Sequence, residues 1–187
     1  KLYKENKHKQ EYIDKCVHWC GINWIQEELK EININAEINN FASIEPKTTP
    51  KEVPKEFSVL SYISQHRSQF YGIDALKELA REFPNIPFKI MGSNFEFPDL
   101  PNLKFLGWVD NASELIDATT VCVRFTEHDG ISNFILESLS KGKTILYNND
   151  LPSVMYCKTI DALKNQLRQT YNMHQEGLLT PNMDGYN

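Results

Sequence analysis

Residues 119–147, TTVCVRFTEHDGISNFILESLSKGKTILY, decide the fold. The apolar run Thr119-Thr-Val-Cys-Val-Arg-Phe125 predicts a strand. A helix is expected from Ser132 to Ser140 and ends at Gly142, because glycine commonly follows the last helical turn. Thr144-Ile-Leu-Tyr147 predicts a second strand. A strand, a helix and another strand in this order are typical of a unit with parallel strands.

The same alternation extends toward the N-terminus. The apolar patterns predict strands over residues 57–63, 88–91 and 103–106, and helices over residues 73–83 and 112–117. We therefore predict an α/β fold, a Rossmann-like parallel sheet with helices on both faces. Ligands of such sheets bind at the carboxyl ends of the strands. This edge is expected to hold Arg67, Gly92, Gly107 and Arg124.

The first part of the chain has a different pattern. Residues 1–10 are polar without periodicity and are expected to form an arm, followed by a helix over 22–31 and a strand over 32–38. Pro46, Pro50 and Pro54 indicate a stiff linker. We predict three regions: residues 1–43, a linker over 44–56, and a main domain over 57–187 that ends in a helical tail.

Charge and composition limit the class of function. Lys and Arg total 20 against 25 Asp and Glu, and the net charge of -5 disfavours nucleic acid as a partner. No apolar run reaches the roughly 20 residues that span a bilayer, which favours a cytoplasmic protein. The four cysteines are expected to be free thiols. Cys16 and Cys20 lack a second ligand pair at zinc-site spacing, so no metal site is predicted.

The segment between the strand and the helix is suited to bind an anion. Gly130 lets the backbone approach a ligand closely, and Ser132 stands where the helix begins with unpaired amides and a partial positive charge. Asp129 and Glu137 place two carboxylates beside this phosphate-sized pocket. Arg124 needs a partner if it is buried, and either a bound phosphate or Asp129 would serve.

These residues also resemble a known family. The segment from Asp129 to Ile145 is similar to the Glu-(seven residues)-Glu segment of glycosyltransferase family 4, in a His-Asp-Gly variant. Tyr71-Gly-Ile-Asp-Ala-Leu-Lys-Glu-Leu-Ala, Phe88-Lys-Ile-Met-Gly92 and Pro101-Asn-Leu-Lys-Phe-Leu-Gly-Trp-Val109 resemble, in order, the elements of that family's C-terminal domain. The resemblance implies the donor-binding half of a GT-B fold over residues 57–160. It also implies that residues 1–43 are a remnant of the N-terminal acceptor domain, within a longer protein.

The resemblance assigns roles to individual residues. Asp129 would hold hydroxyls of the donor sugar, and Glu137 would bind the ribose. The amides of Gly130, Ile131 and Ser132 would hold the diphosphate, and Gly92, Ser93, Trp108 and Val109 would lie beside the base. His66 and His128 are expected to make polar contacts only.

The sequence departs from the family pattern in two ways, by the loss of a positive charge at position 71 and by a shorter acidic side chain at position 129. Tyr71 stands where the family has a lysine, and we expect Arg67 and Arg124 to supply the positive charge for the leaving diphosphate instead. Asp129 is one carbon shorter than the family's glutamate. Asp129-Gly130 is also common turn chemistry, so a purely structural role of Asp129 remains an alternative.

The resemblance implies a retaining glycosyltransferase that needs no metal or other cofactor. Its donor would be a nucleotide-diphosphate sugar, with UDP- and GDP-linked sugars as the first candidates. A glycan or other hydroxyl acceptor would be bound through the missing N-terminal domain, so this chain alone should bind donor without turnover. Polysaccharide biosynthesis is expected at family level, with peripheral membrane association of the full-length protein as an alternative to a fully cytoplasmic one. The rival functions are a nucleotide-sugar 2-epimerase of the same fold and a catalytically degenerate binding module.

Overall fold

The structure is a computed structural model that describes residues 13–39, 50–130 and 132–186. The chain divides into two compact units, Lys1–Ser43 and Ile44–Asn187. The predicted arm over residues 1–10 and the first part of the predicted linker, residues 44–49 with Pro46, lie outside the described residues.

The smaller unit is a strand, a helix and a strand. β1 (His18–Cys20) pairs in parallel with β2 (Ala36–Ile38), and α2 (Asn23–Lys30) connects them. The prediction of a strand over residues 32–38 is wrong in its first half. Asn33 has a φ of 60°, and the amide of Ile34 donates to the carbonyl of Leu29 at 2.9 Å, so these residues close the end of α2. Asparagine tolerates this left-handed conformation, and the local turn outweighs the alternating pattern.

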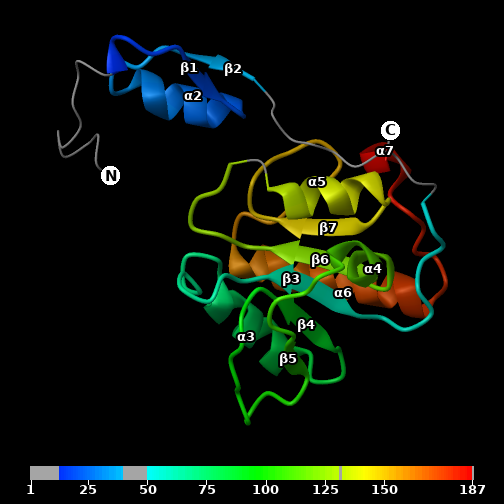
Figure 1. Cartoon of the computed structure of the whole chain (residues 1–187). Helices are drawn as coiled ribbons and strands as arrows, with labels where there is room; N and C mark the ends of the chain where they lie inside the picture. Colours follow the sequence, from blue (N-terminus) through cyan, green and yellow to red (C-terminus); the bar gives the residue numbers. More distant parts are fainter. Residues whose placement is uncertain (1–12, 40–49, 131, 187) are drawn as a thin grey trace. The chain divides into compact units, whose positions relative to one another are not determined.

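The larger unit contains a six-stranded parallel sheet (Figure 1). Its elements are β3 (Val59–Tyr62), α3 (Ile73–Glu82), β4 (Phe88–Met91), β5 (Leu103–Phe105), α4 (Ala112–Asp117), β6 (Val121–Arg124), α5 (Asn133–Ser140), β7 (Thr144–Tyr147), β8 (Met155–Tyr156), α6 (Ile160–Gln175) and α7 (Met183–Tyr186). The predicted parallel α/β sheet is confirmed. Among the described residues, no helix combines the length and the apolar character needed to cross a membrane.

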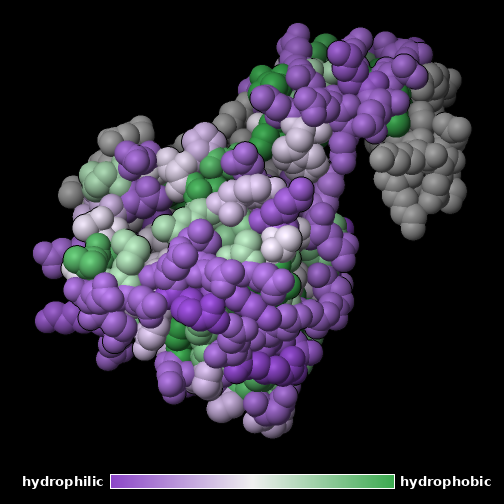
Figure 2. Space-filling view, turned by 180° about the vertical axis from the view of Figure 1, so that it is seen from behind, coloured by the Kyte–Doolittle hydropathy of each residue, from purple (hydrophilic) through white to green (hydrophobic). Residues whose placement is uncertain are grey.

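Helices cover both faces of this sheet because successive strand residues point to opposite sides. Val59 and Val121 pack with α3 and α6 in one core, whereas Leu60 and Cys122 pack with α4 and α5 in the other. Figure 2 shows the molecule from behind, where the surface of the larger unit is mostly hydrophilic. The two faces of the sheet carry separate apolar cores.

The strand order locates the site. The order is β5-β4-β3-β6-β7-β8, so the chain builds outward from β3 in one direction and then from β6 in the other. In open parallel sheets, the crevice outside the carboxyl ends of two such central strands receives the ligand. The loops that follow β3 and β6 therefore border the expected site.

These two loops are joined to each other. The amide of Glu127 donates to the carbonyl of Phe70 at 3.0 Å. Gly72 has a φ of 77°, and a Cβ atom placed on it would lie 1.8 Å from the carbonyl oxygen of Phe125. No side chain fits between these backbones, so Gly72 is required for the contact.

The start of α6 offers a test of local stability. The Thr159 hydroxyl accepts a hydrogen bond from the amide of Ala162 at 3.2 Å and so caps the helix. Thr159→Ala should lower the free energy of unfolding by about 1 kcal/mol. The expected fall in melting temperature is about 2–4 °C, measured by circular dichroism. Thr159→Ser keeps the capping oxygen and should melt near the wild-type temperature; equal losses in both variants would contradict the capping role.

Candidate functional site

A cavity opens at the carboxyl edge of the sheet, on the face covered by α4 and α5. Its volume is ≈ 540 Å³. It is lined by Tyr62, Met91, Trp108, Ala112, Arg124, Ser132, Asn133, Phe134 and Glu137. Four residues that the sequence singled out therefore share one cavity: Trp108, Arg124, Ser132 and Glu137.

Arg124 is the positive charge of this cavity. It ends β6, and only 5% of its surface is exposed. Its Nε donates to Oδ2 of Asp129, and its guanidinium lies over the Tyr71 ring at 5.1 Å. Burial alone would lower the pKa of Arg124, but the hydrogen bond and the negative charge of Asp129 prevail and raise it. Arg124 is therefore a permanent cation at the cavity wall.

The Nη nitrogens of Arg124 are hydrogen-bond donors that remain available to a ligand. Within residues 13–39, 50–130 and 132–186, its Nη nitrogens have no hydrogen-bond acceptor. Tyr71 contributes an aromatic face to Arg124. A cation over an aromatic ring is stabilised by the ring's quadrupole, so this contact helps to hold the arginine in place.

Asp129 is held by two donors on the same oxygen. Besides Arg124, the Tyr147 hydroxyl donates to Oδ2 at 3.0 Å and also lies 3.3 Å from the carbonyl of Gly130. The side-chain amide of Asn149 donates to the Tyr147 oxygen at 3.1 Å. Burial, followed by the negative charge of Asp129, raises the pKa of Tyr147, so the hydroxyl keeps its proton. The pairing of Arg124 with Asp129 that the sequence suggested is present.

Tyr147 and Asn149 were missed by the sequence analysis. In the sheet register, Tyr147 of β7 lies directly beside Arg124 of β6. Their side chains share a face because they are partners in adjacent parallel strands. The sequence contained one indication of this contact. Tyr147 ends the apolar strand over residues 144–147, and Arg124, at the end of the preceding strand, was expected to need a partner if buried.

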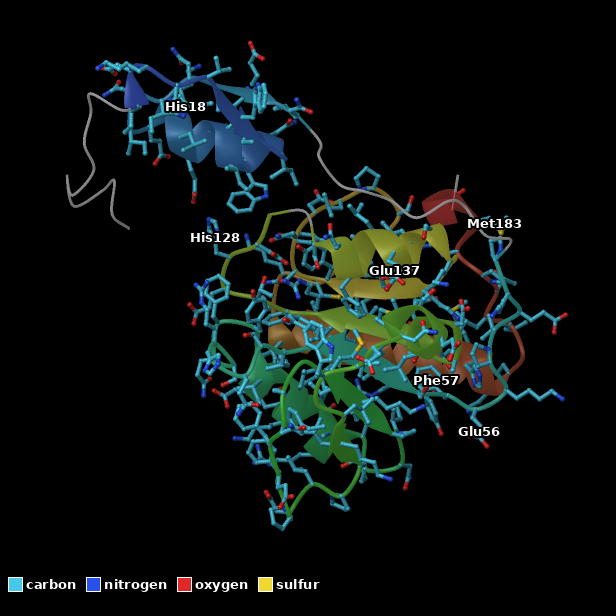
Figure 3. All side chains as sticks on the ribbon, viewed as in Figure 1. His18, Glu56, Phe57, His128, Glu137 and Met183 are labelled. Carbon is cyan, nitrogen blue, oxygen red and sulfur yellow. The ribbon has the colours of Figure 1, made fainter. Side chains whose placement is uncertain are left out.

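The beginning of α5 faces the same cavity. Ser132 is its N-cap residue, and its side chain makes no capping hydrogen bond. Asn133 and Phe134, in the first turn, also line the cavity. Figure 3 locates Glu137 farther along α5 and His128 in the loop before it. Ile131, predicted to contribute an amide, lies outside the described residues. The amides of the first helical turn lack partners within the helix, so this end attracts an anion.

The glycines after β4 and β5 fix the neighbouring loops to each other. The amide of Gly92 donates to the carbonyl of Gly107 at 2.7 Å, and the amide of Gly107 donates to the carbonyl of Ser93 at 3.1 Å. Ser93 is 3% exposed, and its hydroxyl has no hydrogen-bond partner within the described parts of the chain. Val109 packs against the core on the α4 and α5 face. These residues do not line the cavity, but Trp108 beside them does, with 83% of its surface exposed.

Two predicted residues lie on exposed loops. Arg67 follows β3, and its guanidinium lies 4.2 Å from the centre of the Phe70 ring. His128 is exposed in the loop before α5. Neither residue lines the cavity. Among the described residues, no group of three or more histidine, cysteine, aspartate and glutamate side chains is placed to hold a metal ion.

Comparison with known proteins agrees with this architecture. No protein-family model and no curated protein sequence matches the chain. Among solved structures, TarM of S. aureus aligns with a TM-score of 0.76 at 14% identity, over 98% of this chain and 42% of TarM. The pneumococcal O-GlcNAc transferase GtfA, in complex with UDP and GlcNAc, aligns at 0.63 and 18% identity, over 90% of this chain and 40% of GtfA.

A cyanobacterial protein gives a longer match. HepE of Anabaena, in complex with UDP and glucose, aligns with a TM-score of 0.70 at 11% identity, over all of this chain and 64% of HepE. The sheet and helices of this chain therefore have the fold found in GT-B glycosyltransferases. The chain spans less than two thirds of the length of each of these three proteins.

Proposed function

We propose that this chain carries the donor-binding part of a glycosyltransferase, and that its cavity binds a nucleotide-diphosphate sugar. The proposal rests first on one observation. A buried arginine and the beginning of a helix line the same ≈ 540 Å³ cavity as a glutamate and an exposed tryptophan. Similar structures have been solved with UDP and with UDP-glucose, which supports this class of ligand.

Each part of the cavity suits one part of such a donor. The Nη groups of Arg124 and the first amides of α5 would bind the diphosphate, because both present positive charge to the same space. Glu137, farther along α5, would accept hydrogen bonds from the ribose hydroxyls. Trp108 offers an aromatic surface to the base. UDP and GDP remain the first candidates for the nucleotide.

The finer assignment follows the family resemblance. We place the chain with glycosyltransferase family 4, as a variant with Asp129 at the first acidic position. Residues 57–187 would be the C-terminal domain, residues 1–43 a remnant of the acceptor domain, and residues 44–56 the linker. Transfer would proceed with retention of configuration. Arg124 and the start of α5 would stabilise the charge on the departing diphosphate without a metal.

The complete reaction that we propose also involves an acceptor. A sugar would pass to a hydroxyl of a glycan or another acceptor, in polysaccharide assembly in the cytoplasm. The acceptor and its orientation would come mainly from the other domain. The chain by itself is therefore expected to bind donor without detectable turnover.

Calorimetry with UDP, GDP and their glucose, N-acetylglucosamine and mannose conjugates tests donor binding. We expect one nucleotide to bind selectively and Glu137→Gln to weaken it about tenfold or more, since a hydrogen bond to a charged group is worth about 1.5–3 kcal/mol. Glu114→Gln is the matched control, because Glu114 is exposed on α4 and does not line the cavity. Equal affinities of the two variants would argue against the assignment of Glu137. If the wild type binds none of the compounds, the proposal of donor binding is contradicted.

A further inference from the structure

The two side chains that donate hydrogen bonds to the Asp129 carboxylate reach the same one of its two oxygens. Arg124 Nε and the Tyr147 hydroxyl converge on Oδ2. Within the described residues, Oδ1 has no hydrogen-bond donor. The side chain of Asp129 is 15% exposed. The carboxylate is thus fixed through one oxygen and keeps the lone pairs of the other.

The direction of the Tyr147 hydroxyl follows from its neighbours. Asn149 donates its amide hydrogen to the Tyr147 oxygen, so the single hydroxyl hydrogen remains available for an acceptor. The carboxylate at 3.0 Å is both nearer and more negative than the Gly130 carbonyl at 3.3 Å. The hydrogen therefore points to Asp129, because hydrogen bonds to ionised acceptors are the stronger ones.

The side chains that fix Asp129 are themselves rigid. Tyr147 is completely buried, and its strand, β7, lies inside the sheet between β6 and β8. Asn149 has a further contact at 3.5 Å with the carbonyl of Asp129. Hydrogen bonds that hold a ligand-binding carboxylate in one orientation reduce the reorganisation needed on binding.

We infer that Tyr147 and Asn149 are positioning residues that present Oδ1 of Asp129 to a hydroxyl group of the donor's sugar. This inference rests on the proposed function and adds to it the residues that orient the Asp129 carboxylate. A shorter acid at position 129 needs such support, because its carboxylate is nearer the backbone and is drawn toward Arg124. The diphosphate is bound by other groups, the Nη nitrogens of Arg124 and the start of α5. Substitutions of Tyr147 and Asn149 should therefore lower the affinity for the sugar conjugate more than the affinity for the nucleoside diphosphate.

The test compares each nucleoside diphosphate with its sugar conjugate on the full chain. Dissociation constants of UDP, UDP-glucose, UDP-N-acetylglucosamine, GDP and GDP-mannose are measured for the wild type and for Tyr147→Phe, which removes only the hydroxyl. We expect the best-bound sugar conjugate to weaken about tenfold more than its own diphosphate, since one hydrogen bond to a charged group is lost. Asn149→Ala should shift the same ratio in the same direction by a smaller factor. It also serves as the second variant if Tyr147→Phe does not fold.

Tyr171→Phe is the matched control. Tyr171 lies on α6, where its ring packs against Phe57 on the other face of the sheet, and its change should leave the ratio unchanged. Equal weakening of diphosphate and sugar conjugate in both site variants would overturn the positioning role while donor binding stands. A wild type that binds none of the five compounds would overturn donor binding and this inference together.

Discussion

Arg124→Met is expected to weaken the binding of the preferred nucleoside diphosphate at least about 100-fold, or about 2.7 kcal/mol. Arg124 is buried and lines the cavity, and its Nη nitrogens have no acceptor among the residues that the structure describes. Its replacement therefore removes the cation that would meet the diphosphate. Truncating one partner of a buried charge pair commonly costs 2–5 kcal/mol of binding energy. Calorimetry with UDP and GDP measures the effect.

Loss of Arg124 also leaves Asp129 without its cation, so folding and binding must be separated. The double variant Arg124→Met/Asp129→Asn removes both charges of the pair and should regain stability without regaining affinity. Arg81→Met is the matched control, because Arg81 is exposed on α3 and pairs with Asp99 at 3.6 Å. Wild-type affinity in the double variant would show that Arg124 has a structural role only.

Asp117→Asn is expected to lower the free energy of unfolding by about 3 kcal/mol. Lys141 and Lys51 reach the two carboxylate oxygens of Asp117 at 3.1 and 2.7 Å, and Lys143 reaches its backbone carbonyl at 2.7 Å. The side chain of Lys141 is 7% exposed, and Lys143 as a residue is 4% exposed. Breaking a buried pair typically costs 3–5 kcal/mol, because the remaining charge is left buried without compensation. Urea unfolding gives the difference directly.

Two variants show whether the charge itself is responsible. Asp74→Asn breaks the exposed pair with Lys77 and should cost at most about 1 kcal/mol. Adding Lys141→Met to Asp117→Asn should restore part of the loss. If Asp117→Asn costs no more than Asp74→Asn, then the lysines at positions 141 and 143 do not depend on Asp117.

The same group predicts a pH dependence. Burial tends to raise the pKa of Asp117, but the hydrogen bonds and charges of Lys51 and Lys141 prevail and hold it below its ordinary value of 3.8. A carboxyl whose folded-state pKa is lowered contributes stability that is present above the unfolded value and is lost as the pH falls through the folded value. The difference between wild type and Asp117→Asn should therefore be constant near pH 7 and shrink below 3.8.

Two strands of the larger unit have the predicted bounds, whereas others there were predicted one to three residues too long. The strands over residues 88–91 and 144–147 coincide with β4 and β7, because each is a short, mainly apolar stretch with polar residues, glycine or proline on either side. The parallel arrangement followed from the alternation of strands with helices. For the site, the strand pattern placed Arg124 at the carboxyl edge, whereas Trp108 and Glu137 were singled out through the family resemblance; with Ser132, these residues line one cavity.

Features that depend on pairing between distant segments could not be predicted. β1 and β8 contain three and two residues, which is too few to show a period. Tyr147 reaches Asp129 only because β7 pairs with β6 in one register, and a shift by one residue would turn its hydroxyl to the other face. Arg67 was chosen for its place after β3, but its contact with Phe70 depends on the local turn of that loop.

The close approach of Gly72 to Phe125 has a consequence for how this site can change during evolution or engineering. Since the backbones of the two loops touch without room for a Cβ, an insertion or deletion in either loop breaks the contact unless the other changes with it. A loop exchange with another sequence should therefore transplant both loops together. A library that randomises only the segment before α5 should keep residue 72 as glycine and the length of that segment constant.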